Sequence, residues 1–311
     1  MPKVSLCIPS YNQERFIRDA VNSALEQTYA NVEIVVCDDC STDGTAGEIE
    51  RSIADHQAAG GHATVVFVRN EHNLGIVKNW EKAFRLAHGD LLVSCGGDDV
   101  SYPTRAEEIA KAWEASGRTA SILIHGFDRI GLDGKPSNRT VYDWEISAAH
   151  PLGAVTAYSR RVVDDFDPIS DPEGFEDQIF ARRSLLVGEE VRINRPLIAY
   201  RVGSGDTTSG TDPVEQRLKT VRRCLHSYPQ TFTDIEKAKP FATSERLDRV
   251  RKIAEECRRR YPAEYDYLTT CGFWPKFKAY RRYRRAWGLP NHLSSVMDFL
   301  FNQLKGSKQA S

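Results

Sequence analysis

Three pairs of adjacent carboxylates are the candidates for metal binding and proton transfer in the sequence: Asp38-Asp39, Asp98-Asp99 and Glu176-Asp177. If the first two pairs share a crevice, they repel each other unless a positive group lies between them. Oxygen ligands suit Mg²⁺ or Mn²⁺, which combine one or two protein carboxylates with substrate phosphates. Gly96 and Gly97 would let a ligand approach the backbone before Asp98 closely. These residues predict a site for a nucleotide diphosphate and a divalent cation.

Polar residues follow four strand-like segments in succession. These are Pro9-Ser10-Tyr11-Asn12 after strand 4–8, Asp38-Asp39 after 32–37, Arg69-Asn70 after 64–68, and Gly97-Asp98-Asp99 after 91–94. In open parallel sheets, ligands bind beyond the carboxyl ends of the strands. Any one segment is compatible with an ordinary solvated loop, but four at one edge predict a binding site.

The elements that must position these residues alternate along the first 117 residues. Helices are expected at 16–25, 45–60, 77–87 and 104–117, and capping-box patterns at Thr45 and Thr104 open the second and fourth. Continuous apolar strands between helices predict a mostly parallel sheet covered on both faces.

The pattern changes beyond residue 117. A strand is expected at 121–127, a hairpin turn at Asp133-Gly134, a helix at 175–187 and a strand at 197–202, with a mobile loop at 203–211. After Asp212 the pattern is helical. The sequence therefore divides into a domain of residues 1–212 and an extension of residues 213–311.

The charge supports the same division. The chain has 42 Lys plus Arg against 43 Asp plus Glu, yet residues 213–311 hold 21 basic and 10 acidic residues, which leaves 21 and 33 in residues 1–212. Such asymmetry suggests two roles. The acidic part suits a metal and catalytic carboxylates, and the basic part suits phosphates or an anionic surface.

Composition also limits the compartment. No apolar stretch approaches the ~18 residues of a membrane-spanning helix, and the N-terminus lacks the apolar core of a secretory signal. Seven scattered cysteines fit buried thiols in a reducing compartment better than a disulfide framework. The sequence predicts a cytoplasmic protein.

The ordered motifs resemble the signature of the inverting family 2 glycosyltransferases, which have the GT-A fold. The resemblance covers about residues 3–205 and rests on Pro9-Ser10-Tyr11-Asn12, on 38–45, on Asn73-Leu74-Gly75 with Asn79, on Gly89-Asp90 and on Gly97-Asp98-Asp99. It implies a GT-A catalytic domain in residues 1–212, with nucleotide-sugar binding in about 1–100 and the acceptor side in about 101–212. The basic, mainly helical extension 213–311 follows.

The resemblance implies roles for individual residues. Tyr11 and Asp38 or Asp39 would contact the nucleotide base, Asp98 the ribose, and Asp99 the metal on the donor diphosphate. The wider set of expected donor contacts is Pro9, Tyr11, Asn12, Asp38, Asp39, Arg69, Asn73, Asn79, Asp98 and Arg201. The donor expected from the resemblance is a UDP or dTDP sugar, and the acceptor is a saccharide, including a lipid-linked one in polysaccharide assembly.

The sequence departs from the family pattern in two places. Many members have a further acid where this chain has Gly96, which leaves metal binding to Asp99. The family often has a histidine shortly after a Tyr-Arg pair, yet Tyr200-Arg201 is followed by Val202-Gly203-Ser204. Arg201 is the candidate to replace that contact to the diphosphate.

The candidate catalytic base is Asp177, with Glu176 beside it, in a segment that resembles the family's Glu-Asp motif ahead of a helix. The alternative is that both acids are there because carboxylates in a first helical turn are favoured by the helix dipole, by roughly 0.3–1 kcal/mol each.

Other function classes lack their motifs. Cys37-Asp38-Asp39-Cys40 has carboxylates where a redox pair needs a stabilised thiolate, and no second pair completes a zinc site. No G-x-G-x-x-G, P-loop or G-x-S-x-G is present. Two alternatives remain open: a nucleotidyltransferase that makes a nucleotide sugar, and a non-catalytic nucleotide-sugar-binding subunit.

The basic end, residues 273–311, predicts an interaction surface. Its cations Lys276, Lys278, Arg281, Arg282, Arg284 and Arg285 alternate with Phe273, Trp274, Phe277, Tyr280, Tyr283 and Trp287, and an amphipathic helix is expected at 293–304. Packing on the catalytic domain or on a second subunit, as in a homo-oligomer, is one interpretation. Peripheral attachment to an anionic membrane on its cytoplasmic face is the other. Nucleic acid is disfavoured, because the acidic domain would repel it.

Overall fold

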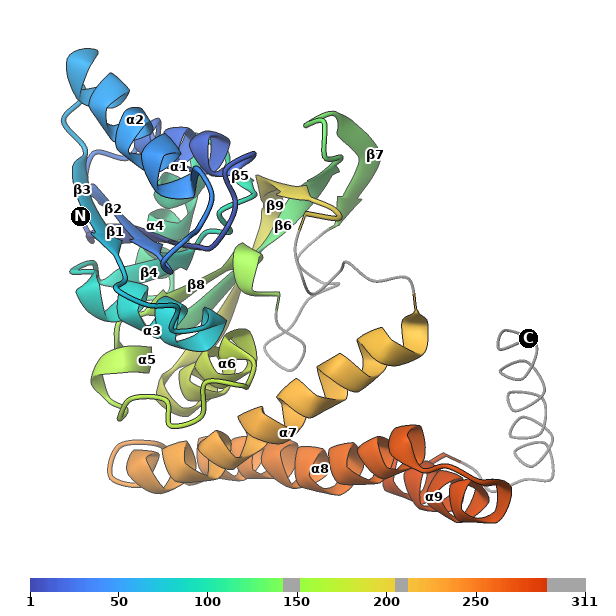
Figure 1. The fold of residues 1–311 in the computed structure, drawn as a ribbon. Coiled ribbons are helices and arrows are strands. Elements are labelled where there is room, and N and C mark those ends of the chain that lie inside the picture. The colour runs from blue at the N-terminus through green and yellow to red at the C-terminus, as the bar shows by residue number, and fades with distance from the viewer. Residues whose placement is uncertain (142–151, 205–211, 290–311) are drawn as a thin grey trace.

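The computed structural model describes residues 1–141, 152–204 and 212–289 of the chain (Figure 1). Its strands are β1 Val4–Ser10, β2 Val32–Asp38, β3 Thr64–Arg69, β4 Leu91–Ser94, β5 Val100–Ser101, β6 Ala120–Ile130, β7 Pro136–Val141, β8 Thr156–Ser159 and β9 Glu189–Arg201. Its helices are α1 Ile17–Leu25, α2 Thr45–Ala58, α3 Ile76–Leu86, α4 Arg105–Ala115, α5 Arg161–Asp164, α6 Glu176–Val187, α7 Pro213–Ala238, α8 Ser244–Thr269 and α9 Phe273–Ala286, with a 3₁₀ helix at Gly153–Val155.

One mixed sheet forms the centre, with the strand order β3-β2-β1-β4-β8-β6-β9-β5 and β7 paired to β6. The strands β3, β2, β1 and β4 are parallel, as predicted, so their carboxyl ends meet at one edge. Beyond β4 the sheet is mixed, because β8 is antiparallel to both β4 and β6, while β9 is parallel to β6 and antiparallel to β5. The predicted hairpin turn joins β6 to β7, and Gly134 adopts a φ of +75° there.

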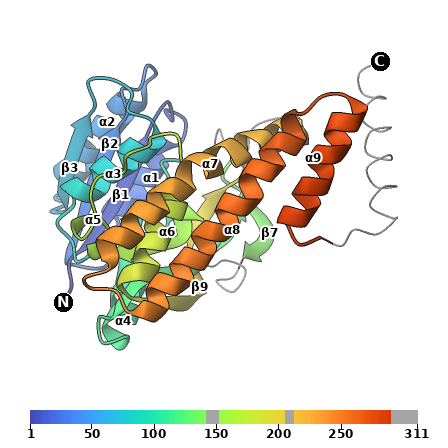
Figure 2. The ribbon, with the colours of Figure 1, turned by 90° about the horizontal axis from the view of Figure 1, so that it is seen from below.

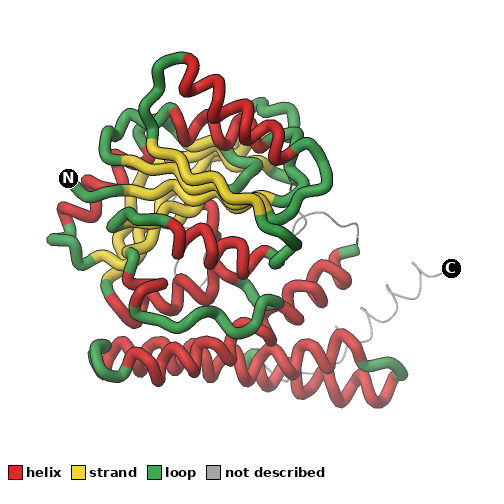
Figure 3. The backbone as a smooth tube through the Cα atoms, turned by 60° about the vertical axis from the view of Figure 1, so that its left-hand side comes forward, coloured by secondary structure: helices red, strands yellow, loops and turns green. Residues whose placement is uncertain are grey.

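Helices cover both faces of the sheet (Figure 3). Successive residues of a strand point to opposite faces, so a strand whose residues are all apolar must be covered on both sides. Leu6 and Ile8 of β1 pack in a core with α1, α2 and α4. Cys7, between them, belongs to the core on the other face with α3, α5 and α6. These two layers confirm the predicted fold class.

The C-terminal extension is helical, as predicted, and it adds a layer beneath α6 (Figure 2). Ile235 and Ala238 of α7 and Val250 of α8 belong to the same buried cluster as α6, so the extension shares a core with the preceding domain. None of the described helices is both long and apolar enough to cross a membrane. The helix expected at 293–304 and the loop residues 205–211 lie outside the described residues.

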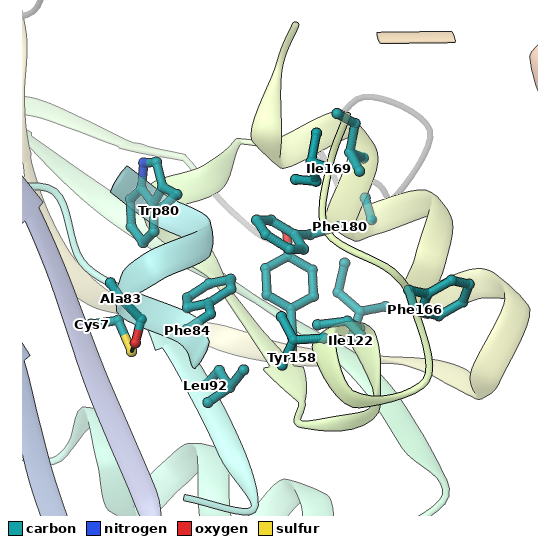
Figure 4. Packing of buried hydrophobic residues seen from close by; sticks show 14 of the residues in the cluster. Cys7, Trp80, Ala83, Phe84, Leu92, Ile122, Tyr158, Phe166, Ile169 and Phe180 are labelled. Carbon is teal, nitrogen blue, oxygen red and sulfur yellow. Dashed lines mark hydrogen bonds between the residues drawn. The ribbon is translucent and has the colours of Figure 1, made fainter. Parts of the chain in front are cut away.

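An aromatic cluster fixes α6 on the sheet (Figure 4). Phe84 of α3 lies 4.8 Å from Phe180 of α6 between ring centroids, and Tyr158 of β8 lies 6.0 Å from each of them. All three side chains are buried. The cluster therefore determines where the first turn of α6, with Glu176 and Asp177, can lie.

The predicted capping boxes were wrong. The N-cap of α2 is Gly44, and the Thr45 hydroxyl instead donates to Asp43 Oδ1 at 2.5 Å and accepts from Gln13 N at 2.7 Å. Thr104 is the N-cap of α4, but its side chain makes no capping hydrogen bond. At Thr45 the hydroxyl joins the loops after β1 and β2 instead of the helix end.

Candidate active site

The loops after β1 and β2 are locked together at the rim of the sheet. Asn12 N donates to Ser41 Oγ at 2.9 Å, and Thr42 N donates to Asn12 Oδ1 at 2.9 Å. Asn12 has a φ of +51°, which asparagine tolerates better than most residues. Pro9 is buried in β1, whereas Tyr11 is 44% exposed. Of the residues predicted after β1, Tyr11 and Asn12 are exposed to solvent, and Asn12 uses its backbone N–H and its Oδ1 to hold the two loops together.

Asp38 and Asp39 are both buried and both bonded within the protein. Asp38 accepts hydrogen bonds from the backbone and hydroxyl of Ser41. Asp39 accepts from Asn70 Nδ2 and Leu74 N at 2.8 Å and from Gly75 N at 2.9 Å. Asp39 thus fastens the loop after β3 to the loop after β2.

Three other predicted donor contacts surround this pair. Arg69 donates to Ser41 O at 2.9 Å and lies 3.4 Å from Asp38 Oδ2, yet its side chain stays 55% exposed. Asn73 is exposed, and its Oδ1 accepts from Gly75 N at 2.9 Å. Asn79 is only 2% exposed and spans Cys37 O and Asn70, so it supports the rim from beneath.

The acidic pair after β4 forms a small cradle around Gly96. A Cβ atom at Gly96 would lie 2.7 Å from Asp99 Oδ2 and 2.9 Å from Asp98 Oδ1. Both oxygens therefore converge on a point that any side chain at position 96 would crowd. With glycine at position 96, in place of the additional acid of the family pattern, the two carboxylate oxygens can come this close.

Asp99 is 6% exposed, and Arg201 N donates to its Oδ1 at 2.8 Å. Burial, followed by the negative charge of Asp98, raises the pKa of Asp99 to about 8. The described residues hold no group of three or more His, Cys, Asp or Glu arranged to bind a metal. A cation at this cradle would therefore need further ligands from a substrate or water, which is how Mg²⁺ commonly binds.

Arg201 braces the acidic loop from β9. Its guanidinium donates to Asp98 O at 2.8 Å and Gly131 O at 3.2 Å and lies 4.7 Å from the ring centroid of Phe16. The residue is 4% exposed. In this arrangement Arg201 shapes the cradle, and its side chain is occupied by protein partners.

Glu176 and Asp177 begin α6, as predicted. Asp177 Oδ1 accepts from Gln178 N at 2.7 Å, and its Cβ lies 3.5 Å from the point where a Gly153 Cβ would sit. Burial and then the charge of Glu176 raise the pKa of Asp177 to about 7, while burial raises the pKa of Glu176 and Arg223 opposes that rise. The arrangement suits a base that is partly ionised near neutral pH.

Arg105, which sequence reasoning missed, links the two acidic sites. Its guanidinium donates to Ser94 O at the end of β4 at 2.7 Å and to Ala154 O, next to Gly153, at 2.8 Å. It also donates to His125 Nε2 at 3.1 Å and is 1% exposed. The sequence contains one indication of this role. A cation in the first turn of a helix is disfavoured by the helix dipole, which suggests that Arg105 is stabilised by contacts elsewhere in the fold.

The family of this chain follows from its similarity to known proteins. The model of glycosyl transferase family 2 matches residues 5–163, slightly more than half of the chain. The chain belongs to glycosyl transferase family 2. The match includes every predicted rim residue from Pro9 to Asp99, but neither Asp177 nor Arg201.

Curated relatives agree with this assignment. EpsE of Bacillus subtilis (strain 168), named as a glycosyltransferase, is 36% identical over 136 residues, which are 43% of this chain and 47% of EpsE. TuaG of the same organism, named for teichuronic acid biosynthesis, is 27% identical over 141 residues, 45% of this chain and 53% of TuaG. The matched region spans about half the length of these curated relatives.

Solved structures share the fold of this member of glycosyl transferase family 2. S. aureus TarS in complex with UDP-GlcNAc superposes with a TM-score of 0.56 at 17% identity, covering 93% of each chain. The mannosyltransferase PcManGT of Pyrobaculum calidifontis, in complex with GDP-Man and Mn²⁺, gives 0.59 at 14% identity, covering 97% of this chain and 80% of that one. Both likenesses support the GT-A fold together with its helical extension.

Proposed function

We propose that this protein transfers a glycosyl group from a nucleotide-diphosphate sugar to an acceptor hydroxyl with inversion at the anomeric carbon. One observation carries the proposal: a family 2 domain presents a carboxylate cradle at the end of β4 and a separate carboxylate of raised pKa, Asp177, at the start of α6. With Asp177 as the base and the acceptor hydroxyl as the nucleophile, the reaction is one displacement, which inverts the centre.

The donor nucleotide would lie across the rim after β1 to β4. Tyr11, Asn12, Arg69 and Asn73 are exposed there and are our candidates for contacts to the nucleotide, with Asp98 on the ribose. Asp38, Asp39 and Asn79 would support these contacts from beneath. A UDP or dTDP sugar is the proposed donor, and solved structures of S. aureus TarS with UDP-GlcNAc and with UDP are consistent with it.

Asp99 would hold a divalent cation, Mn²⁺ or Mg²⁺, together with the donor diphosphate. The fit rests on the cradle, because Asp98 Oδ1 and Asp99 Oδ2 converge where position 96 has no side chain. When bound, such a cation neutralises charge on the leaving diphosphate as a Lewis acid. Arg201 would keep Asp99 oriented through its backbone N–H.

Asp177 would accept the proton of the attacking hydroxyl. The acceptor oxygen forms a bond to the anomeric carbon, the bond from that carbon to the diphosphate oxygen breaks, and the electron pair leaves with the diphosphate. The proton passes to the Asp177 carboxylate. A well-placed base contributes roughly 10²–10⁴-fold to the rate.

The acceptor is proposed to be a saccharide, including a lipid-linked one at the cytoplasmic face of a membrane. On α9, Trp274, Lys278, Arg281 and Arg285 are exposed and recur at spacings that place them on one helix face. Tyr280, Tyr283 and Trp287 instead pack toward α8 and α7, with Tyr283 stacked on Tyr267 at 5.2 Å. The packing interpretation thus describes these three aromatic residues, and the basic face is our proposed membrane contact.

A thermal-shift panel of nucleoside diphosphates, with and without Mn²⁺, tests the donor site. A ligand at 100 times its Kd should stabilise the protein by ~2.7 kcal/mol. Transfer from the donor that gives the largest shift, followed by NMR of the product's anomeric configuration, then tests inversion. Absence of any nucleotide-dependent shift, or retention in the product, would contradict the proposal.

A further inference from the structure

The segment just before Asp177 is held by α7 of the C-terminal extension. Arg223 Nε and a terminal guanidinium nitrogen donate to Gly174 O at 3.0 and 2.8 Å, and the guanidinium lies 3.8 Å from the ring centroid of Phe175. Phe175 N donates to Ser227 Oγ at 2.7 Å. Arg223 also pairs with Glu176 Oε2 at 3.2 Å. Every residue from 174 to 176 therefore contacts α7.

The contact leaves little room for a side chain at position 174. A Cβ atom there would lie 3.0 Å from Ser227 Oγ and 3.3 Å from Ser227 Cα, tighter than ordinary packing. The backbone of α7 therefore approaches this segment directly, and a side chain at position 174 would crowd Ser227. The extension is packed against the candidate active site.

The charged and titratable groups around Asp177 come from three described elements. Glu176 and Arg182 lie on α6, Arg223 on α7 and Tyr158 on β8. The side chains of Arg223 and Glu176 are 15% and 14% exposed, so their ion pair is largely shielded from water. Removing one partner of such a pair leaves the other as an uncompensated buried charge.

We propose that Arg223 is a positioning residue for the reaction: from the extension it fixes segment 174–176 and keeps the Glu176 carboxylate charged beside Asp177. The inference rests on the proposed function, because Arg223 acts on the reaction only if Asp177 is its base. An ionised Glu176 makes Asp177 a stronger base, since a nearby like charge favours protonation, and this effect on the pKa of Asp177 is larger than the direct, opposite effect of Arg223. Arg223 itself does not touch the reacting atoms.

The central variant is Arg223→Gln, with Arg222→Gln as its matched control. Arg222 is the exposed neighbour on α7, and its guanidinium faces Tyr265 at 5.9 Å. We expect Arg223→Gln to lower kcat by about 10²-fold, the effect of a displacement of about 1 Å at a reacting group. Donor affinity by calorimetry should stay that of wild type, and Arg222→Gln should match wild type in both.

Arg223→Lys tests whether charge and geometry can be separated. Lysine restores a cation beside Glu176, but it lacks the fork that donates twice to Gly174 O and the planar group that stacks on Phe175. We expect kcat between those of wild type and Arg223→Gln. A lysine variant no better than glutamine would show that the Glu176 pair contributes nothing.

Titration gives a readout that needs no acceptor. In protein labelled with ¹³C at glutamate carboxyls, the Glu176 resonance is assigned by its loss in Glu176→Gln. It should titrate at higher pH in Arg223→Gln than in wild type, and at the wild-type pH in Arg222→Gln. In Glu176→Gln, the acid limb of the kcat profile should move to lower pH, because Asp177 loses a like charge.

The outcomes separate this inference from the proposed function. If wild type binds nucleotide but transfers no sugar, or if Asp177→Asn remains active, the proposed function fails. If Asp177→Asn is inactive while Arg223→Gln keeps the wild-type kcat, or loses activity only through donor KM, the role of Arg223 is overturned. An unmoved Glu176 titration in Arg223→Gln also overturns it.

Discussion

At the residue scale, Asp177 is the side chain on which the chemistry depends. Its carboxylate is largely shielded from water beside Glu176, and its backbone position is fixed by α6. Asp177→Asn keeps the size of the side chain and removes the base. We expect the variant to bind nucleotide as wild type does and to lose about 10²–10⁴-fold in kcat.

Glu173→Gln is the control for this substitution, since Glu173 is an exposed acid in the same segment. It should leave the rate unchanged. If Asp177→Asn stays within about tenfold of wild type, both acids return to the role of favouring the first turn of α6.

The pH dependence of the reaction follows from the same group. The active form of Asp177 is the carboxylate, and burial with the charge of Glu176 raises its pKa to about 7. Activity should therefore fall as the pH is lowered through about 7, well above the ordinary pKa of an aspartate carboxyl. A profile of kcat from pH 5 to 9 measures it, and an acid limb near pH 4 would contradict the assignment.

The free energy of unfolding should fall as the pH rises, whereas the activity rises with pH. Because the folded pKa of Asp177 is raised, the folded state binds this proton more strongly than the unfolded chain does. The folded state therefore loses stability as the pH rises from about 4 to about 7, and Asp177→Asn avoids that loss. The variant should be more stable than wild type at pH 8 and equally stable at pH 4, as measured by denaturant unfolding.

Asp99 governs a different step. Its Oδ2 converges with Asp98 Oδ1 at Gly96, so nucleotide affinity in wild type should rise when Mn²⁺ is added. Asp99→Ala should remove most of that gain, whereas Glu50→Gln, an exposed acid on α2, should keep it. Calorimetry with the nucleoside diphosphate decides, and equal affinity with and without metal in wild type refutes the metal role.

The sequence predicts where the polar residues of this rim lie, but it does not predict that several of them are buried. Asp38 and Asp39 lie at the strand end, as predicted, and Asn79, expected from the resemblance, lies on α3; all three are buried. Asp38 is bonded to the nearby Ser41, whereas Asp39 and Asn79 are bonded to segments 35 and 42 residues away along the chain. Residue type and spacing show that a polar group is present, whereas its burial depends on how the following loop folds back. Arg223 was hidden for a related reason, since nothing local distinguishes it from Arg222.

At the scale of elements, the first four strands were predictable because each carries a continuous apolar run in its own sequence. β5 and β8 span two and four residues and exist through pairing with β9 and with β4 and β6. Such short strands have no periodicity of their own. The mixed half of the sheet therefore depends on tertiary pairing that a local pattern does not contain.

The aromatic cluster beneath α6 makes an element-scale prediction. Phe180→Ala removes a fully packed ring between Phe84 and Tyr158 and should lower the free energy of unfolding by about 3–5 kcal/mol. Phe241→Ala, at a ring that is 39% exposed, should cost clearly less. Urea unfolding measures both, and equal losses would show that the cluster does not hold α6.

At the scale of the whole molecule, the charge is divided between an acidic domain and a basic extension. The extension is attached through α7, which shares its core with α6, whereas α9 lies farther along against α8 (Figure 2). No acid is found on α9 between Phe273 and Ala286. Arg282 is paired with Asp266 of α8, so the face that carries Lys278, Arg281 and Arg285 is the part of α9 that we expect to meet a negative surface.

The last prediction follows from that face. Each Lys or Arg near an anionic bilayer contributes about 1 kcal/mol, so changing Lys278, Arg281 and Arg285 together to Gln should reduce partitioning onto anionic vesicles by about 10²-fold. Changing Arg249, Lys252 and Arg259, exposed cations on α8, to Gln removes the same net charge and should have a much smaller effect. Sedimentation with phosphatidylserine-containing vesicles at low and high salt measures the difference, because attraction of this kind is screened by salt. If wild type remains in the supernatant at low salt, or if the two triple variants bind equally, α9 is a packing or subunit-contact element, because its own face then confers no attraction to the bilayer.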